Sequence, residues 1–359
     1  MNETSSAAGL PRQASAASRI YLRPLGLQAG AALDWQALEL IVREDETRLT
    51  RAVLDDTGLR AWAADQAPDV AMQLEARLKA LRAPRARLAG HVLDRPLVMG
   101  VVNVTPDSFS DGGDHADPTV AIAAGRRMSS AGAHIIDVGG ESTRPRAQQP
   151  EAATELARVM PVIEALTGDG LTVSIDTRRA GVMREAVASG ASIINDVSAL
   201  TGDGESLAVA ASLGAPVILM HMQGTPEMMQ DNPAYDAAPF DVFDWLEIRV
   251  AECVAGGVAP DRIAVDPGIG FGKTLEHNLE ILRDLAVFHG LGCPLAIGVS
   301  RKAFIGRLSD EPEPKRRLAG SLSAMLHAVD QGAHIVRVHD VAETVQALAV
   351  RASLERPRA

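Results

Sequence analysis

The feature that most constrains the fold is a regular alternation of short apolar runs with longer amphipathic stretches. Eight runs rich in β-branched or aliphatic residues follow one another from residue 97 onward, and each precedes a stretch of helical periodicity. They lie at residues 97–103, 134–138, 171–176, 192–195, 216–220, 262–266, 294–299 and 334–338. Strands that alternate with helices are typical of repeated βα units, so the pattern predicts an α/β fold with a parallel sheet.

A short internal repeat supports this division. The dipeptide Gly-Ala begins at Gly132, Gly190, Gly214 and Gly332, each time between a helical stretch and the next run. Glycine is favoured there because a helix often ends in a left-handed conformation. Residues 97–353 also match the length of a TIM (β/α)8 barrel, about 250 residues. We therefore expect that barrel; the alternative, an open doubly wound sheet, lacks the Gly-x-Gly-x-x-Gly turn it would carry after its first strand.

The first 90 residues follow a different pattern, which divides the chain into three parts. Residues 1–18 are rich in Ala and Ser and lack the apolar segment of a secretory signal, so we expect a disordered tail rather than a transit peptide. Residues 19–90 are expected to form a small, mostly helical N-terminal extension, with a strand at 20–27 and helices at 34–43 and 72–81. The barrel should occupy residues 91–355, and the extension should serve packing or oligomerisation.

Composition excludes several classes of partner. The formal net charge of −11 argues against nucleic acid and against an anionic membrane surface, since both favour a basic protein. No apolar run approaches the roughly 18 residues that a membrane helix needs. Two cysteines, Cys253 and Cys293, are too few for a disulfide framework or a thiolate metal site, and they indicate reduced thiols in a cytoplasmic protein.

Polar side chains stand at the ends of several apolar runs, where barrel enzymes carry their functional groups. Any one of them could be a helix cap or a satisfied core residue, but together they converge on one end of the barrel and predict a ligand site. They are Asn103, Asp176, Asn195, Asp196, Asp266, Ser300, Arg301, Lys302, Arg337, His339 and Asp340.

These side chains fall into two groups by charge. Asp176, Asn195 and Asp266, together with Lys302, offer acceptors and donors for a flat heterocycle that carries both N–H groups and a carbonyl. Arg337 and His339 form the second group, which favours an anionic ligand.

Arg337 and His339 are two residues apart, so they share one face of the eighth predicted strand. The loops after strands seven and eight are the usual phosphate position in this fold, which predicts an anion there. Asn103 is placed to help hold a divalent cation that bridges phosphate oxygens, as Mg²⁺ does in many phosphate sites.

Two loops have the composition of lids. Residues 105–113 (TPDSFSDGG) follow the first run, and residues 139–145 (GGESTRP) follow the second. Both combine glycine with hydroxyl groups, charges and proline. Glycine-rich βα loops are often inert, but two of them on neighbouring strands beside a polar barrel mouth favour mobile lids.

The sequence blocks and their order resemble the dihydropteroate synthase family. The resemblance covers residues 91–353 and rests on VMGVVNVTPDSFSDGG (98–113), IIDVGGESTRP (135–145), SIDT (174–177), IIND (193–196), MHMQGTP (220–226), DPGIGFGK (266–273), SRK (300–302) and RVHDV (337–341). It implies condensation of 6-hydroxymethyl-7,8-dihydropterin diphosphate with 4-aminobenzoate to give 7,8-dihydropteroate and diphosphate, on the route to folate. It also implies Mg²⁺ as cofactor and a homodimer.

The resemblance assigns residues to three subsites. The pterin pocket would use Asp176, Asn195, Asp266 and Lys302, with Met220 and Phe271 as apolar walls. The diphosphate site would use Asn103, Arg337 and His339, with Asn103 on the metal. The aminobenzoate pocket and its lid would use Phe109, Asp111, Thr143, Arg144, Pro145, Ser300 and Lys302, and the loops at 105–113 and 140–149 would close over the substrates.

The implied mechanism is a dissociative substitution without a covalent enzyme intermediate. Its catalytic residues would be Asp176, Asp266, Lys302, Arg337 and His339. The cationic pair and Mg²⁺ would neutralise the departing diphosphate, the two carboxylates would stabilise the cationic pterin methyl group, and the bound amine would attack.

Two other interpretations and some departures from the family pattern stay open at this point. A methyltetrahydrofolate:corrinoid methyltransferase shares the barrel and the ring-binding carboxylates, but it binds no diphosphate and needs no cationic pair. A pterin-binding protein without activity would not need the lids. Arg178–Arg179 stand where many members have a lysine nearby, Ile269 stands where an aromatic residue is common, and Arg146–Ala147 replace a more usual glycine. These departures concern loop closure and sulfonamide sensitivity.

Overall fold

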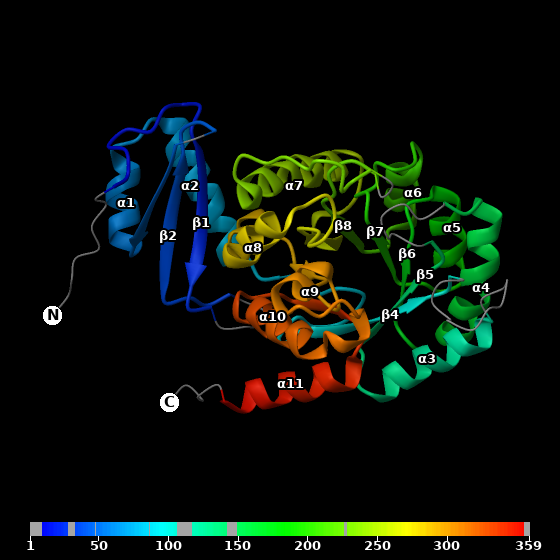
Figure 1. Ribbon diagram of the computed structural model, residues 1–359. Coiled ribbons are helices and arrows are strands. Elements are labelled where there is room, and N and C mark those ends of the chain that lie inside the picture. The colour runs from blue at the N-terminus through cyan, green and yellow to red at the C-terminus, as the bar shows by residue number, and fades with distance from the viewer. Residues whose placement is uncertain are drawn as a thin grey trace.

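Eight parallel strands form a barrel surrounded by helices, and a smaller three-stranded sheet lies against its side (Figure 1). The structure is a computed structural model that describes residues 9–27, 33–46, 48–85, 87–105, 117–141, 149–225 and 228–354. The barrel strands are β4 (Leu97–Asn103), β5 (Ile135–Gly139), β6 (Val173–Asp176), β7 (Ile193–Asp196), β8 (Val217–Met220), β9 (Ile263–Asp266), β10 (Ala296–Ile297) and β11 (Ile335–Val338). Each lies within or overlaps one of the eight predicted runs, so that prediction is confirmed.

The strand order closes the sheet into a barrel. Hydrogen-bonded neighbours run β10-β11-β4-β5-β6-β7-β8-β9, and every pair is parallel. A parallel bridge between Val265 and Leu295 joins the two ends of that order. The expected α/β TIM barrel is therefore correct, and the open-sheet alternative is wrong.

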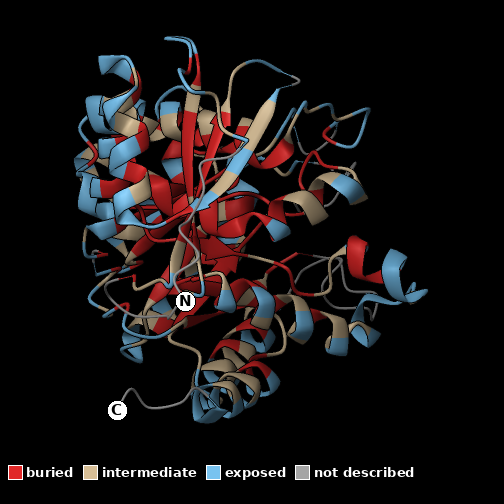
Figure 2. Ribbon diagram, turned by 90° about the vertical axis from the view of Figure 1, so that its left-hand side faces the viewer, coloured by how far each residue is buried: buried red, intermediate tan, exposed pale blue. Residues whose placement is uncertain are grey.

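Helices follow the strands and cover the outside of the barrel. They are α3 (Pro118–Ser130), α4 (Ala152–Gly168), α5 (Ala180–Ala188), α6 (Ser206–Leu213), α7 (Ala238–Ala255), α8 (Leu275–Arg283), α9 (Ala303–Ser309), α10 (Leu318–Asp330) and α11 (Val341–Leu354), with short 3₁₀ turns η2 (Pro260–Arg262), η3 (Leu285–Leu291) and η4 (Pro314–Arg316). All four glycines of the Gly-Ala repeat have positive φ, between 61° and 103°. Figure 2 shows the strands buried at the centre and the helices exposed on their outer faces.

The N-terminal extension is a three-stranded antiparallel sheet with two helices on one face. Its elements are β1 (Arg19–Leu25), β2 (Ala37–Arg43), β3 (Leu49–Leu54), α1 (Asp56–Ala64) and α2 (Pro68–Arg82). The strand predicted at 20–27 and the helix predicted at 72–81 are confirmed as β1 and as part of α2. The helix predicted at 34–43 is wrong, because that segment pairs on both sides as β2.

Alternation along β2 explains the correction. Leu38, Leu40 and Val42 are buried in the core of the extension, whereas Ile41 belongs to the core cluster of the barrel. Both faces of the strand are therefore covered, so its sequence carries few polar residues to reveal a period of two. Pairing in the sheet outweighs the helix propensity of Ala, Leu and Glu.

Residues 9–18 are anchored to the extension, so the expected disordered tail is wrong for this part. The Trp62 indole N–H donates to Pro11 O (3.1 Å), and the Gln66 amide N–H donates to Arg12 O (2.9 Å). The Ala14 N–H donates to Gln66 Oε1 (2.7 Å). Residues 1–8 lie outside the described residues.

Among the described residues, no helix is both long enough and apolar enough to cross a membrane. Cys253 and Cys293 are both buried and form no disulfide. The sequence prediction of two free thiols is therefore confirmed.

Candidate active site

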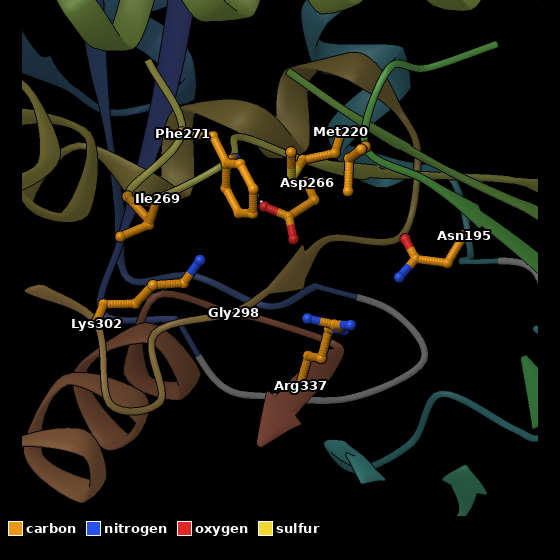
Figure 3. A pocket seen from close by; sticks show the side chains of 10 residues that line it. Asn195, Met220, Asp266, Ile269, Phe271, Gly298, Lys302 and Arg337 are labelled. Atoms are coloured by element: carbon orange, nitrogen blue, oxygen red, sulfur yellow. Dashed lines mark hydrogen bonds between the residues drawn. The ribbon is translucent and has the colours of Figure 1, made fainter. Parts of the chain in front are cut away.

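A cavity of about 330 Å³ opens at the carboxyl ends of the barrel strands. Figure 3 shows Lys302 and Arg337 on one side, facing Asp266 and Phe271 across the cavity, with Asn195 at one end. The complete lining is Asn195, Val197, Met220, Asp266, Gly268, Ile269, Phe271, Gly298, Lys302 and Arg337. Charged groups thus face an apolar wall across one recess that is partly open to solvent, which is typical of a ligand site.

Arg337 is the centre of a buried ionic network. Its Nε donates to Asp137 Oδ2 and its Nη2 donates to Asp176 Oδ2, both at 2.6 Å. The Asn195 amide also donates to Asp137 Oδ2, at 3.2 Å. The side chain of Asp137 is fully buried. One guanidinium is therefore shared by two carboxylates that come from neighbouring strands, β5 and β6.

Asp266 is held by the turn that follows β9. Its Oδ1 accepts the backbone N–H of Gly268 at 2.7 Å. Gly268 has a φ of +71°, and a Cβ at this position would overlap the carbonyl oxygen of His221, so only glycine fits. The close approach of the two loops fixes the position of the Asp266 carboxylate at the cavity wall.

Lys302 and Phe271 form a cation–aromatic pair. The Lys302 Nζ lies 4.0 Å from the centroid of the Phe271 ring. Phe271 belongs to a small apolar cluster with Val197, Met220 and Met229, which forms one wall of the cavity. A flat ring bound in the cavity would meet apolar side chains on this side and charged groups on the other.

Burial moves the pKa values of Asp176, Asp266 and Lys302 toward neutral pH. Desolvation raises the pKa of Asp176, while Arg337 acts in the opposite direction and Asp137 adds to the increase. Desolvation also raises the pKa of Asp266 and lowers that of Lys302 to about 8. The pKa of Arg337 is raised despite its burial, because the carboxylates around it favour the charged form. Perturbed titratable groups in a cleft are a common property of active sites.

His339 and Ser300 lie together beside the cavity rather than in its lining. The backbone N–H of His339 donates to Ser300 Oγ at 3.2 Å, and the ring Nδ1 of His339 lies 3.0 Å from the same oxygen. Burial lowers the pKa of His339 to about 4, so its ring is neutral at pH 7. As a neutral ring it can donate a hydrogen bond to an anion but adds no positive charge.

Asn103 lies at the end of β4, close to Asp176. A Cβ on Gly139 would lie 3.7 Å from Asn103 Oδ1 and 3.6 Å from Asp176 Oδ2, so both oxygens border the same small space. No group of three His, Cys, Asp or Glu side chains suited to a metal occurs among the described residues. Asp176 Oδ2 is already paired with Arg337, so Asn103 Oδ1 would be the protein ligand. One protein oxygen fits Mg²⁺, which often takes only one or two of them together with substrate phosphates.

The structure brings most of the predicted pterin residues into one cavity. Asn195, Met220, Asp266, Phe271 and Lys302 line it directly. Asp176 is not part of the lining, but it accepts a hydrogen bond from Arg337, which is. The predicted place of Arg337 was the diphosphate site. The predicted aminobenzoate and lid residues outside the described part of the chain are Phe109, Asp111, Thr143, Arg144 and Pro145.

Sequence reasoning missed Asp137 and Lys273. Asp137 was overlooked because it precedes the end of β5 by two residues, yet residues two apart share a strand face, which was the available signal. The buried Lys273 Nζ donates to Phe271 O (3.0 Å) and lies 3.0 Å from His221 Nδ1. It therefore joins the loops after β8 and β9 directly behind the apolar wall.

The departure at Arg178–Arg179 has a structural explanation. Arg178 Nη2 pairs with Glu141 Oε1 at 2.6 Å, and Arg179 Nη1 pairs with the buried Glu155 Oε2 at 2.6 Å. Thr177 donates to the other oxygen of Glu155, also at 2.6 Å. Both arginines thus neutralise carboxylates at the base of the loop after β5 rather than facing the cavity.

A comparison with known protein families identifies the class to which the barrel belongs. A family described as pterin binding enzyme matches residues 99–339. Together with the barrel and its polar cavity, this match defines the class: a pterin-binding (β/α)8 enzyme.

Individual relatives narrow the class to one family. The dihydropteroate synthase of Escherichia coli (strain K12) is 48% identical over 259 residues, which cover 72% of this chain and 91% of that protein. The enzyme of Synechocystis sp. is 45% identical over 263 residues, covering 73% and 91%. A solved structure of Xanthomonas albilineans dihydropteroate synthase with 4-aminobenzoic acid has a TM-score of 0.72 and 46% identity, covering 77% of this chain and 100% of that chain. This chain belongs to the dihydropteroate synthase family, whose members are transferases.

Proposed function

We propose that this protein condenses 6-hydroxymethyl-7,8-dihydropterin diphosphate with 4-aminobenzoate to form 7,8-dihydropteroate. The observation that carries the proposal is the convergence of Asp266, Asn195, Lys302 and Arg337 on one cavity beside an apolar wall. Solved structures of the Xanthomonas albilineans relative are described with 4-aminobenzoic acid and with 7,8-dihydropteroate.

The pterin ring binds between the apolar wall and the charged side of the cavity. Asp266 uses one oxygen for the Gly268 N–H, which leaves the other to accept from the amino-pyrimidine edge. Asn195 offers both a donor and an acceptor, and Phe271 with Met220 covers one ring face. Lys302 donates to a ring acceptor from the opposite side.

Binding of the substrate exchanges partners within the network around Arg337. In the protein alone, Asp176 Oδ2 is occupied by the Arg337 Nη2. A pterin N–H group takes over this acceptor, and the released guanidinium edge turns toward the diphosphate. The hydrogen bond from Arg337 Nε to Asp137 is kept throughout. The guanidinium can therefore rotate about this bond without becoming an unpaired buried charge.

The leaving group is stabilised by positive charge and by hydrogen-bond donors. Arg337 and Lys302 supply the charge, and the neutral His339 ring donates a hydrogen bond. Mg²⁺, when bound at Asn103, would neutralise phosphate oxygens and make diphosphate a better leaving group. Donors arranged in advance around a developing charge are worth several kcal/mol in a site that excludes water.

The substitution is dissociative. The bond between the pterin methylene carbon and the diphosphate oxygen breaks first, and Asp176 with Asp266 stabilises the resulting cation through the ring. The amine nitrogen of 4-aminobenzoate then forms the new C–N bond and releases its proton to solvent. Position matters more than basicity here, because the aromatic amine is already unprotonated at pH 7.

The remaining assignments stay predictions. Ser300, Phe109, Asp111, Thr143, Arg144 and Pro145 are expected to hold the aminobenzoate and to form the lid. A cytoplasmic homodimer is the expected assembly, which light scattering of the purified protein would check.

A turnover assay tests the proposal. The purified protein should release diphosphate and form dihydropteroate from the two substrates, and it should do so faster with Mg²⁺ than with a chelator. With the amine omitted, slow release of diphosphate would support the dissociative order. Absence of dihydropteroate under all of these conditions would overturn the proposed function, and methyl transfer from methyltetrahydrofolate would favour the rival class.

A further inference from the structure

We propose that the N-terminal extension is a positioning element for the pterin pocket and that Arg43 is the residue through which it acts. The inference rests on the proposed function for the identity of the ligand, but the contacts that carry it do not depend on any ligand. The extension lies outside the matched family region, which begins at residue 99. Its contacts are therefore additional to the barrel that the family model covers.

The first link joins the extension to the loop that precedes α7. Arg43, at the end of β2, donates from Nη1 to Asp241 Oδ1 at 2.6 Å. The other oxygen of Asp241 accepts the backbone N–H groups of Asp236 (2.9 Å) and Ala237 (3.0 Å). Asp241 thus caps the start of α7 while Arg43 neutralises it, so the arginine determines how firmly this carboxylate is held.

The second link runs from that loop to the floor of the pocket. Tyr235, directly before the capped residues, donates its hydroxyl to Gly272 O at 2.7 Å. Gln230 donates its side-chain N–H to Gly270 O at 3.1 Å. These two carbonyls flank Phe271, whose ring forms the apolar wall beneath Lys302. A shift of the loop before α7 would therefore move Phe271.

The extension also packs directly against the first turns of α7. The Tyr21 ring packs on Phe240 and Phe243, with centroid distances of 4.7 and 5.3 Å. Arg77 lies 4.6 Å over the Phe243 ring, and Arg51 lies 5.3 Å over the Phe240 ring. Figure 1 shows the sheet and α2 of the extension beside α7 and α8, the two helices that follow the strands of the pocket floor.

The extension contributes the positive charges of this interface and the barrel contributes the negative ones. Arginines of the extension meet carboxylates of the barrel: Arg19 pairs with Asp244 at 2.7 Å and with Glu247 at 2.6 Å, besides the pair of Arg43 with Asp241. Of the carboxylates in these pairs, Asp241 is the one that also holds the loop before α7, as far as the described residues show. Asp244 instead accepts from Tyr21 of the extension at 2.9 Å. The interface therefore contains one ion pair that is linked to the pocket, Arg43 with Asp241, and one that is not, Arg19 with Asp244.

The test compares Arg43→Gln with Arg19→Gln. Both remove one positive charge from the same sheet; Arg43→Gln breaks its pair with Asp241 of α7, and Arg19→Gln breaks pairs with two carboxylates of α7. We expect Arg43→Gln to accelerate hydrogen exchange of the Asp236 and Ala237 amides in the unliganded protein and to raise KM for the pterin diphosphate about three- to ten-fold. KM for 4-aminobenzoate should stay within about two-fold, and Arg19→Gln should leave both KM values and the exchange unchanged.

Two further variants separate positioning from general destabilisation. Arg43→Lys keeps the charge and should restore most of the pterin affinity. Tyr235→Phe breaks the second link, so its effect on the pterin KM should be less than additive with Arg43→Gln but additive with Arg19→Gln. Urea midpoints of all variants would identify any that fail to fold, in which case Arg43→Lys and Tyr235→Phe carry the test.

The outcomes distinguish this inference from the proposed function. Equal effects of Arg43→Gln and Arg19→Gln, or unchanged exchange at Asp236 and Ala237, would overturn the positioning role even if the wild type is fully active. A wild type without turnover would overturn the proposed function, whereas faster exchange in Arg43→Gln alone would still support the physical link.

Discussion

Replacing Asp137 with asparagine should lower kcat/KM without unfolding the protein. Asp137 is fully buried, and its Oδ2 accepts from Arg337 Nε at 2.6 Å and from the Asn195 amide at 3.2 Å. Asparagine has the same shape and can still offer a carbonyl oxygen, but it removes the negative charge. Of its two carboxylate partners, Arg337 then keeps Asp176. The guanidinium is therefore expected to shift toward Asp176 and away from residue 137.

The magnitude follows from this geometry. Removing one partner of a buried ion pair costs about 3–5 kcal/mol when nothing replaces it. Here Asp176 still holds the guanidinium at 2.6 Å and the amide preserves a hydrogen bond, so the lost interaction is closer to that of one hydrogen bond to a charged group, about 2 kcal/mol. If this difference appears in the transition state, kcat/KM falls about 30-fold.

Steady-state kinetics as a function of pH provides the assay. Asp137 contributes to the raised pKa of Asp176 by repulsion, so its neutralisation should move the acidic limb of the kcat/KM profile toward lower pH. Asp169→Asn is the control, because it removes a carboxylate from an exposed pair with Arg126 on the outside of the barrel. A kcat/KM within two-fold of the wild type, with an unmoved acidic limb, would refute the role of Asp137 in holding the Arg337 guanidinium.

The remaining predictions concern the same cavity. Arg337→Ala should reduce kcat/KM about hundred-fold, mainly through KM for the pterin diphosphate, since it leaves two buried carboxylates without their cation; an unchanged value would remove this residue from the anion site. Asp176→Asn should weaken pterin binding about ten-fold in calorimetry, and equal affinity would count against its contact with the ring edge. Gly268→Ala should lower the urea midpoint and the pterin affinity together, because its Cβ would overlap the His221 carbonyl; a normal midpoint would show that the turn can adjust. The wild-type kcat/KM should rise as pH increases through about 7, where Asp176 ionises to accept pterin N–H groups, and fall through about 8, where Lys302 loses its charge; a flat profile between pH 6 and 9 would contradict this assignment.

Much of the barrel could be predicted because its signals are local. Each strand run is apolar and short, and each Gly-Ala pair marks a helix end by a requirement for positive φ that other residues meet poorly. The carboxyl ends of parallel strands must gather at one end of a barrel, so the sequence alone predicts that Asp266, Asn195 and Lys302 lie close together.

What could not be predicted depends on partners that are distant in sequence. Arg337 was expected on the diphosphate alone, but its pairing with Asp137 joins residues 200 positions apart, and no local pattern reveals it. The strand β2 was mistaken for a helix because the barrel covers the face that would otherwise be polar. Arg43 and Asp241 show the same limit, since their pair joins the extension to α7 across 198 positions.

The Gly-Ala repeat that predicts the helix ends also contributes to the pairing of the strands that follow them. In two of its four copies the Gly-Ala pair continues into histidine, His134 and His334. Each donates its backbone N–H to the neighbouring strand at 2.8 Å, to Val98 O and Leu295 O, and its Nδ1 accepts the N–H of that same residue, at 3.0 and 3.1 Å. Burial lowers the pKa of both rings, which keeps Nδ1 available as an acceptor. These reciprocal pairs join β5 to β4 and β11 to β10 where those strands begin, at the end of the barrel opposite the cavity. A histidine at this position therefore adds a side-chain hydrogen bond to the strand pairing, which the serine and proline of the other two copies do not supply in the same form.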